Sequence, residues 1–175
     1  GRNTSHILEK DFNIDMVKDG VLFDGYWQSE MYFKGFQNVI KQAFHFINRI
    51  ESDNSKAVKL ITDCNSIGLH VRKGDYIANP KVFNEYGQIC DESYYNKAIE
   101  QIKGMVNEPV FFVFSNDFKW AKTYLNLPVN THFIDWNTAE RSNFDMQLMS
   151  SCRHNIISNS SFSWWAAWLN NFKDK

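Results

Sequence analysis

The sequence predicts an α/β fold in which a parallel sheet carries helices on both faces. From residue 66 onward, strand-like segments alternate with helix-like segments, and this alternation is typical of a parallel sheet covered by helices. One predicted strand, Val110 to Phe114, is apolar on both faces, as expected for a strand inside such a sheet. The chain has 175 residues, of which 43% are hydrophobic, so it can form one domain with a substantial core.

The individual elements follow from apolar spacing and from the residues that begin or end helices. Apolar runs predict strands at Val21 to Trp27, Ser66 to Val71, Val110 to Phe114, Thr131 to Ile134 and His154 to Ser158. Helical spacing predicts one or two amphipathic helices within Glu30 to Ile50, and further helices at Asp91 to Met105, Asp117 to Leu125, Phe144 to Cys152 and Phe162 to Phe172. Polar composition predicts loops at Glu51 to Lys56 and Lys73 to Asn79. We expect residues 1–20 to be an N-terminal remnant or connector and residues 21–175 to be one Rossmann-like domain.

Composition excludes several classes of protein. The net charge is −1, so no global basic field attracts nucleic acid, and any anion site must be local. No apolar run approaches the roughly 20 residues that a membrane helix needs. The three cysteines, Cys64, Cys90 and Cys152, show neither metal spacing nor a disulfide framework, which favours buried thiols in a reducing compartment. We therefore expect a cytoplasmic protein, at most in peripheral contact with the inner membrane.

Three polar segments follow predicted strands, and they are the candidate site. These segments are His70 to Tyr76, Ser115 to Asp117, and Ser158 to Ser161. Because ligands of parallel sheets gather at the carboxyl ends of the strands, we expect the three segments to converge. The sequence lacks the glycine-rich phosphate loops, the zinc-protease motif and the serine-hydrolase motif. It also lacks an Asp-x-Asp pair, so we expect a site that works without a metal.

The first segment is cationic and suits a diphosphate. Arg72 can offer a planar, bidentate fork, whereas Lys73 can offer only a point charge. Adjacent residues of a strand point to opposite faces, so we expect one of them to enter the site and the other to pair with Asp75 or face solvent. His70 could contact a base or a phosphate, or it could be a packing residue. The alternative for the whole segment is that these are ordinary charges at the end of a strand.

The other two segments each allow a structural and a functional interpretation. Ser160 and Ser161 lie where a strand gives way to a helix, so they could cap the helix or present its free N–H groups to phosphate. Asp117 could cap the next helix or accept hydrogen bonds from a guanine base. The aromatic residues of the last helix are mainly expected in the core, although one ring could line a base or sugar pocket: Phe162, Trp164, Trp165 and Trp168.

These segments resemble the motifs of one family. His70-Val71-Arg72-Lys73-Gly74-Asp75-Tyr76 is similar to the HxRRGDY motif of α1,2-fucosyltransferases, glycosyltransferase family 11. Phe114 to Asp117 with Trp120 resembles the second motif of that family, and the stretch from Asp145 to Asn170 resembles the third. The similarity covers about residues 20 to 172. Lys73 departs from the motif, which has a second arginine there.

The resemblance implies a two-lobed GT-B glycosyltransferase in which this chain is the C-terminal donor-binding lobe. The family has a glycine-rich segment in an N-terminal acceptor lobe, and this sequence contains no counterpart, so we expect that lobe to be absent here. The implied reaction is an inverting, metal-independent transfer of L-fucose from GDP-fucose to the 2-hydroxyl of a terminal galactose. A GDP-sugar-binding module without turnover, a structural domain with a decayed site, and a fucosyltransferase of another linkage such as α1,6 stay open.

The resemblance also implies roles for individual residues. By motif position, Arg72 would grip the β-phosphate, and Asp75 is a candidate base or an ion-pair partner of its cationic neighbours. The implied donor-binding residues are His70, Arg72, Lys73, Asp117, Ser160, Ser161 and Phe162. The implied supporting residues are Gly74, Tyr76, Asp145 and Asn159.

Overall fold

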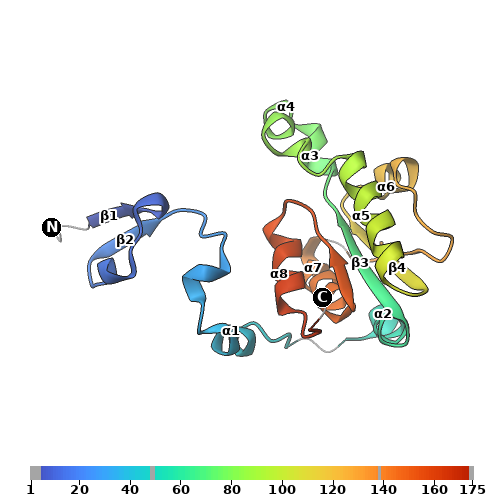
Figure 1. Ribbon diagram of the computed structural model, residues 1–175, viewed down its shortest axis with the longest axis horizontal. Helices are drawn as coiled ribbons and strands as arrows, with labels where there is room; N and C mark the ends of the chain where they lie inside the picture. Colours follow the sequence, from blue (N-terminus) through green and yellow to red (C-terminus); the bar gives the residue numbers. More distant parts are fainter. Residues whose placement is uncertain (1–4, 48–49, 138, 174–175) are drawn as a thin grey trace. The chain divides into compact units, whose positions relative to one another are not determined.

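The computed structural model describes residues 5–47, 50–137 and 139–173 (Figure 1). The chain divides into two compact units, and the boundary lies between Ala43 and Phe44. The segment expected to be a connector, residues 1–20, therefore belongs to the first unit, together with residues up to Ala43. Among the described residues, none of the helices has the length and apolar character needed to span a bilayer.

The smaller unit is organised around a pair of parallel strands, β1 (Ser5–Leu8) and β2 (Val21–Asp24). The strand predicted at Val21 to Trp27 is present but ends at Asp24. The Glu9 carboxylate accepts hydrogen bonds from the backbone N–H groups of Tyr26 (2.8 Å) and Trp27 (3.0 Å), which ties the chain after β2 to the chain after β1. Edge-to-face ring contacts join Phe12, Phe23, Trp27 and Tyr32.

The amphipathic segment predicted at Glu30 to Ile50 contains two short helical elements. They are η3 (Glu30–Phe33), a 3-10 turn, and α1 (Gln37–Ala43). Residues 48–49 lie outside the described residues. Two apolar side chains of this segment, Phe36 and Val39, are 64% and 62% exposed.

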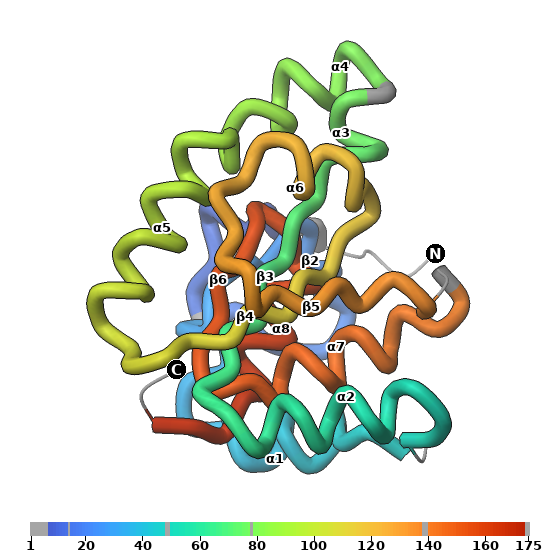
Figure 2. Tube along the Cα trace, turned by 90° about the vertical axis from the view of Figure 1, so that its right-hand side faces the viewer, coloured from blue at the N-terminus to red at the C-terminus, as the bar shows by residue number. Residues whose placement is uncertain are grey.

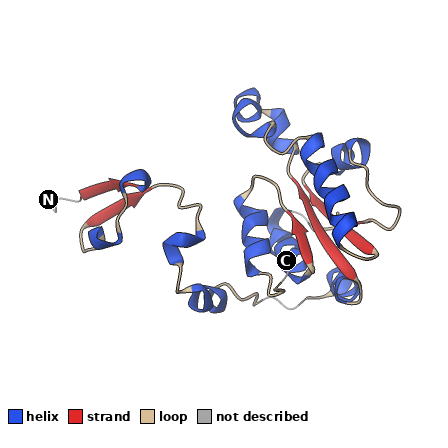
Figure 3. Cartoon of the chain, in the orientation of Figure 1, coloured by secondary structure: helices blue, strands red, loops and turns tan. Residues whose placement is uncertain are grey.

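The larger unit contains the predicted parallel sheet. Its strands are β3 (Asn65–Val71), β4 (Pro109–Ser115), β5 (His132–Phe133) and β6 (His154–Ile156). They run parallel in the order β5-β4-β3-β6 (Figure 3). The four central side chains of β4, from Phe111 to Phe114, are at most 1% exposed, as expected of a strand covered on both faces. The predicted α/β fold is confirmed.

Helices cover both faces of this sheet. Successive strand residues point to opposite faces, so each strand contributes side chains to both layers of the core. On one face, α5 (Glu92–Met105) and α6 (Phe118–Tyr124) pack on side chains that include Leu69 and Val113. On the other face, α2 (Ser52–Thr62), α7 (Ser142–Ser151) and α8 (Ser161–Leu169) pack on Phe112 and Phe114. Figure 1 shows α5 and α8 on opposite sides of β3, and Figure 2 shows α2 and α7 side by side.

Two predicted loops are wrong. The segment Glu51 to Lys56 begins helix α2, whose buried residues Asn54, Ala57 and Ile61 form one stripe at helical spacing. Because Asn54 is polar, its place in this buried stripe hides the helical pattern in the sequence. Its side-chain amide can be buried there because its hydrogen-bond partners come from far along the chain. The segment Lys73 to Asn79 contains the one-turn helix α3 (Gly74–Ala78), and α4 (Pro80–Val82) and the π-helical turn η4 (Phe83–Gly87) follow it.

The three cysteines are free thiols, with Cys90 and Cys152 buried and Cys64 half-buried. Burial raises the pKa of each of these thiols, so none of them carries thiolate character at neutral pH.

Candidate functional site

The sheet brings the three polar segments to one edge. Strand β3 lies between β4 and β6, and all three run parallel, so the segments that follow them leave the sheet at the same carboxyl edge. Direct contacts join these segments. The Asn116 side-chain oxygen accepts hydrogen bonds from the backbone N–H groups of Lys73 (3.0 Å) and Gly74 (3.2 Å). His70 Nδ1 lies 2.9 Å from the Ser158 hydroxyl oxygen.

Arg72 directly follows β3, which lies between β4 and β6, and its guanidinium is only partly engaged. One of its terminal nitrogens donates to Asp75 Oδ2 at 2.8 Å, and its guanidinium carbon lies 5.4 Å from the Tyr76 ring centroid. Its Nε atom is buried and has no hydrogen-bond partner among the described residues. The side chain as a whole is 36% exposed, so the rest of the guanidinium is open to a ligand.

Asp75 is held by two partners. Its Oδ2 atom accepts from Arg72, and its Oδ1 atom accepts from the Asn116 amide at 2.6 Å. The hydrogen bond from Arg72 is the largest cause that lowers the pKa of Asp75. A carboxylate with a lowered pKa and two donors is a weak base. These contacts favour the ion-pair interpretation of Asp75 over that of a general base.

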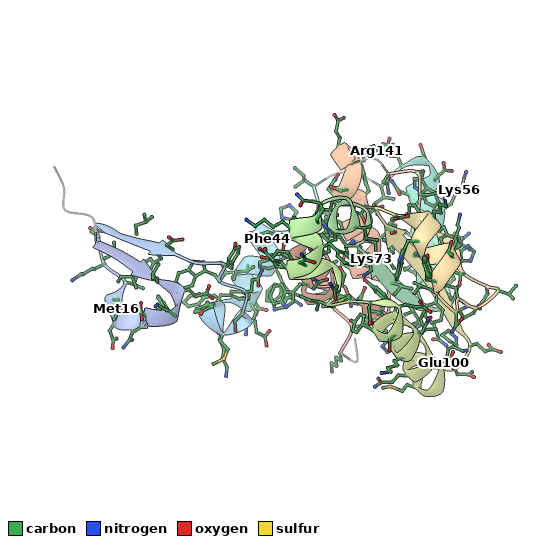
Figure 4. All side chains as sticks on the ribbon, turned by 90° about the horizontal axis from the view of Figure 1, so that it is seen from above. Met16, Phe44, Lys56, Lys73, Glu100 and Arg141 are labelled. Carbon is green, nitrogen blue, oxygen red and sulfur yellow. The ribbon has the colours of Figure 1, made fainter. Side chains whose placement is uncertain are left out.

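The Lys73 side chain is buried, with 4% of the residue exposed. Its ammonium group donates to the Gly87 carbonyl at 2.7 Å and lies 5.0 Å from the Trp120 ring centroid. Burial lowers the pKa of this group. In Figure 4, Lys73 lies within the larger unit, whereas Lys56, Glu100 and Arg141 lie at its periphery. Of the two adjacent cations, Arg72 is the one that pairs with Asp75.

The third segment leads into the first turn of α8. Ser160 stands at the position that precedes this helix, but its side chain makes no capping hydrogen bond. Simple capping therefore does not account for Ser160. Ser161 is exposed, and the Phe162 ring centroid lies 5.4 Å from that of His70. A helix start with uncapped N–H groups favours an anion.

Two further hydrogen bonds tie Asn159 of the third segment to the first segment and to η4. The Tyr76 hydroxyl donates to the Asn159 carbonyl at 3.2 Å. The Asn159 amide in turn donates to the Tyr86 carbonyl at 3.0 Å. The backbone of Gly74 lies close to that of Asn116, and a Cβ atom at position 74 would stand 2.9 Å from the Asn116 carbonyl oxygen. This close contact favours glycine at position 74. The predicted supporting residues Gly74, Tyr76 and Asn159 thus all hold neighbouring segments in place.

Asp117 caps α6, as its structural interpretation requires. Its Oδ1 atom accepts from the Trp120 backbone N–H at 2.9 Å, and its own N–H donates to the Ser115 hydroxyl. The sequence singled out Asp117 in this segment, yet its neighbour Asn116 makes the contacts to the first motif. The position of Asn116 directly after a buried strand was the available signal.

Asp145 belongs to a part-buried polar network in the first turn of α7. The Asn137 amide donates to Asp145 Oδ1 at 2.7 Å and to Asn54 Oδ1 at 3.0 Å. Asn54 Oδ1 also accepts from the Trp136 indole at 2.8 Å. Burial raises the pKa of Asp145 to about 6, against the hydrogen bond from Asn137, which lowers it. The partners Asn54 and Asn137 were not predicted, because nothing near Asp145 in sequence marks them.

Residues 7–174 match the family model described as Glycosyl transferase family 11. The chain belongs to this family. The resemblance that the motifs predicted is therefore confirmed, and this membership covers both units of the chain.

Relatives with assigned names carry related activities. The chain is 41% identical over 160 residues to an alpha-1,2-colitosyltransferase of Escherichia coli, covering 89% of this chain and 53% of that protein. It is 37% identical over 164 residues to the O-antigen biosynthesis glycosyltransferase WbnK of Escherichia coli, covering 91% and 54%. It is 34% identical over 105 residues to galactoside alpha-(1,2)-fucosyltransferase 2 of Mus musculus, covering 59% and 30%. The chain thus spans about half the length of the bacterial relatives. No solved structure matches it significantly.

Proposed function

We propose that the larger unit binds the nucleotide-sugar donor of an α1,2-glycosyltransferase. The reaction is the transfer of L-fucose, or a closely related deoxy sugar, from its GDP conjugate to the 2-hydroxyl of a terminal galactose. One observation carries the proposal: the segment around Arg72 and the start of α8 meet at one edge of the sheet, where His70 and Ser158 are 2.9 Å apart.

In this proposal the diphosphate binds between these two features. Arg72 supplies a guanidinium on a side chain that is 36% exposed. The first turn of α8 supplies backbone N–H groups, and the Ser160 hydroxyl makes no capping bond. Fixed donors of this kind stabilise the charge that develops on a departing diphosphate, and they need no metal ion to do so. The proposed site is therefore metal-independent, with Arg72 as its cation.

The proposed chemistry is a single displacement with inversion. The acceptor oxygen forms a bond to the anomeric carbon as the bond from that carbon to the phosphate oxygen breaks, and the electron pair of that bond leaves with GDP. The acceptor proton must pass to a base. Because Asp75 has two hydrogen-bond partners, we assign it the orientation of Arg72 in this proposal, and not the acceptance of the proton.

The remaining predicted donor-binding residues divide by their contacts. The Lys73 ammonium is committed to Gly87 and Trp120, so we assign it the anchoring of the η4 segment and not a phosphate contact. Asp117 uses one oxygen for the cap of α6, which leaves the other for the guanine contact that the family resemblance implies. Phe162 packs beside His70 and would line the donor site there.

The identity of the sugar depends on one hydroxyl. Colitose is the 3-deoxy counterpart of L-fucose, and the relatives named above include transferases of both sugars. A site that hydrogen-bonds a substrate hydroxyl rejects the analogue without it by about 10⁴–10⁵-fold, whereas an apolar pocket discriminates only about 10²-fold. Parallel assays with GDP-fucose and GDP-colitose therefore separate a fucosyltransferase from a colitosyltransferase.

The central experiment replaces Arg72. For Arg72→Ala, we expect GDP affinity by calorimetry to fall, and fucosyl transfer to lactose to fall on the order of 10²-fold or more, because one charge-stabilising contact is lost. Arg141→Ala is the matched control, since this exposed arginine stacks on Phe144 at the start of α7, and it should leave both quantities unchanged. Normal GDP affinity and turnover in Arg72→Ala would contradict the proposal.

The same assays separate the alternatives. Linkage analysis of the product distinguishes α1,2 from α1,6 transfer. GDP binding without transfer of any linkage would identify a binding module. A folded protein that does not bind GDP would identify a structural domain with a decayed site.

A further inference from the structure

A buried line of hydrogen bonds runs from His70, at the end of β3, into the first turn of α8. His70 Nδ1 and the Ser158 hydroxyl oxygen are 2.9 Å apart, and the Ser158 and Ser163 hydroxyl oxygens are 3.3 Å apart. The Ser163 hydroxyl also lies 3.2 Å from the Ser160 carbonyl and 3.4 Å from the Ser158 carbonyl. His70, Ser158 and Ser163 are 7%, 4% and 0% exposed, so water competes little for these contacts.

The direction of this line follows from the number of protons. Each hydroxyl group has one proton to donate, and a carbonyl oxygen can only accept. If Ser163 donates to the Ser160 carbonyl, then Ser158 can donate to Ser163, and Ser158 must accept from His70 Nδ1–H. In this order three of the four contacts are hydrogen bonds, and the one not made is the longest, from Ser163 to the Ser158 carbonyl at 3.4 Å.

The reverse order satisfies fewer contacts. If Ser163 donates to Ser158, and Ser158 donates to His70 Nδ1, the contact from Ser163 to the Ser160 carbonyl is lost. That carbonyl still accepts from the Trp164 backbone N–H, so the reverse order costs a hydrogen bond but leaves no acceptor unpaired there. The Tyr95 hydroxyl is buried and has no hydrogen-bond partner among the described residues, so it adds no contact to this line.

The imidazole is neutral in this setting. Burial, with a smaller contribution from the Arg72 charge, lowers the pKa of His70 to about 4. Its other nitrogen, Nε2, has no hydrogen-bond partner among the described residues. His70 keeps 7% of its surface exposed, and Nε2 is the ring nitrogen that is left for a ligand.

We propose that Ser163, acting through Ser158, is a positioning residue that holds His70 as the Nδ1–H tautomer, so that Nε2 presents a bare lone pair to the ligand. This inference rests on the proposed function for the identity of the ligand. A lone pair accepts a hydrogen bond and repels a phosphate oxygen, which is itself an acceptor. His70 thus receives an N–H or O–H group of the nucleoside or sugar, and Arg72 receives the diphosphate.

The spacing of the two residues fits this division. His70 lies in β3 and Arg72 directly follows the last residue of that strand, Val71. Two positions of extended chain span about 6.5 Å and direct their side chains to the same side. That separation allows one residue to contact the diphosphate and the other an adjoining part of the same ligand.

The first test needs no ligand. Nitrogen-15 NMR of the histidine-labelled chain reports which ring nitrogen of His70 carries the proton. We expect Nδ1–H in the wild type, and a shift of population toward Nε2–H in Ser163→Ala, because Ser158 is then free to donate to Nδ1. Ser158→Ala removes the partner of Nδ1 altogether and should also mix the tautomers. A wild type with Nε2–H, or a Ser163→Ala variant with an unchanged tautomer in a normal fold, would overturn the proposal.

Ser66→Ala is the matched control for these variants. Ser66 is fully buried, as Ser163 is, but it lies in β3 at the end opposite to His70. Its hydroxyl accepts from the Arg153 backbone N–H. Its replacement should leave the His70 tautomer unchanged. A tautomer change in Ser66→Ala as large as that in Ser163→Ala would mean that loss of any buried hydroxyl disturbs the ring.

The second test uses calorimetry with GDP and with pyrophosphate. Pyrophosphate has no N–H group or sugar hydroxyl, so Ser163→Ala should weaken GDP binding by about tenfold, which corresponds to about 1.4 kcal/mol, and leave pyrophosphate binding unchanged. Arg72→Ala should weaken both. Equal losses for GDP and pyrophosphate in Ser163→Ala would overturn the assignment of His70. A wild type that binds neither ligand would refute the proposed function while leaving the tautomer result intact.

Discussion

Replacing Asp145 by Asn should stabilise the folded protein at neutral pH. The Asp145 carboxylate is largely buried, and its Oδ1 atom accepts a hydrogen bond from the Asn137 amide at 2.7 Å. An asparagine keeps this acceptor and removes the charge. The folded protein therefore no longer holds a poorly solvated carboxylate, and the contact to Asn137 stays in place.

The pKa of Asp145 sets the size of the effect. Burial raises that pKa from 3.8 to about 6 in the folded protein. Because each pKa unit corresponds to about 1.4 kcal/mol, the ionised carboxylate lowers the free energy of unfolding by up to about 3 kcal/mol above pH 6. A raised carboxylate pKa means that the folded state binds the extra proton, so this loss of stability grows as pH rises through the window from about 4 to 6. At pH 5 the loss should be about half of its value at pH 7.5.

Thermal unfolding of the wild type and Asp145→Asn at pH 7.5 and pH 5 measures this difference. We expect the variant to melt about 5–10 °C higher at pH 7.5, with a clearly smaller gain at pH 5. Asp53→Asn is the control, because this side chain is 59% exposed and pairs with Lys56 at the surface. Its melting temperature should change little at either pH. A lower melting temperature for Asp145→Asn at pH 7.5, or a gain that is equal at both pH values, would refute the reasoning.

Two further replacements test how the site loop is held. For Gly74→Ala, the new Cβ would stand 2.9 Å from the Asn116 carbonyl oxygen, so the loop must shift. We expect the free energy of unfolding in urea to fall by about 1–3 kcal/mol and GDP binding to weaken. An unchanged unfolding midpoint would show that the loop can shift at no cost. For Asn116→Ala, the N–H groups of Lys73 and Gly74 and the Asp75 carboxylate lose a partner. We expect the free energy of unfolding in urea to fall by about 1–3 kcal/mol and GDP affinity to fall as well. Unchanged GDP affinity would show that the loop keeps its shape without Asn116.

The fold was predictable to the extent that it depends on local pattern. The apolar run from Val110 to Phe114 predicted a buried strand, and β4 contains it. The acidic start and apolar face of Asp91 to Met105 predicted a helix, and α5 begins just after Asp91, whose side chain caps it. The start of α2 was missed because Asn54 occupies a buried helical position, and its amide is satisfied by Trp136 and Asn137, more than 80 residues away.

The motif residues of the candidate site were identified from sequence, but most of their contacts were not. The carboxyl-edge rule for parallel sheets predicted that the segments after β3, β4 and β6 would meet, and hydrogen bonds between them are present. The same rule could not assign Asn116 its bridging contacts, because the partners of a side chain depend on which groups the next strand brings opposite to it. Nor could it identify the buried contacts of Ser163 with Ser158 and Ser160, because Ser163 looks like an ordinary helix residue in sequence.

Apolar periodicity and strand-end chemistry were thus sufficient to identify a parallel α/β sheet and the motifs gathered at its edge, because both depend on residues that are neighbours along the chain. Which of the two adjacent cations faces Asp75 depends on residues that are distant in the sequence. The Gly87 carbonyl and the Trp120 ring take up the Lys73 ammonium, and these groups come from segments 14 and 47 positions farther along the chain. Only the folded arrangement brings such distant groups within a few ångströms, so only the folded arrangement could assign the two charges.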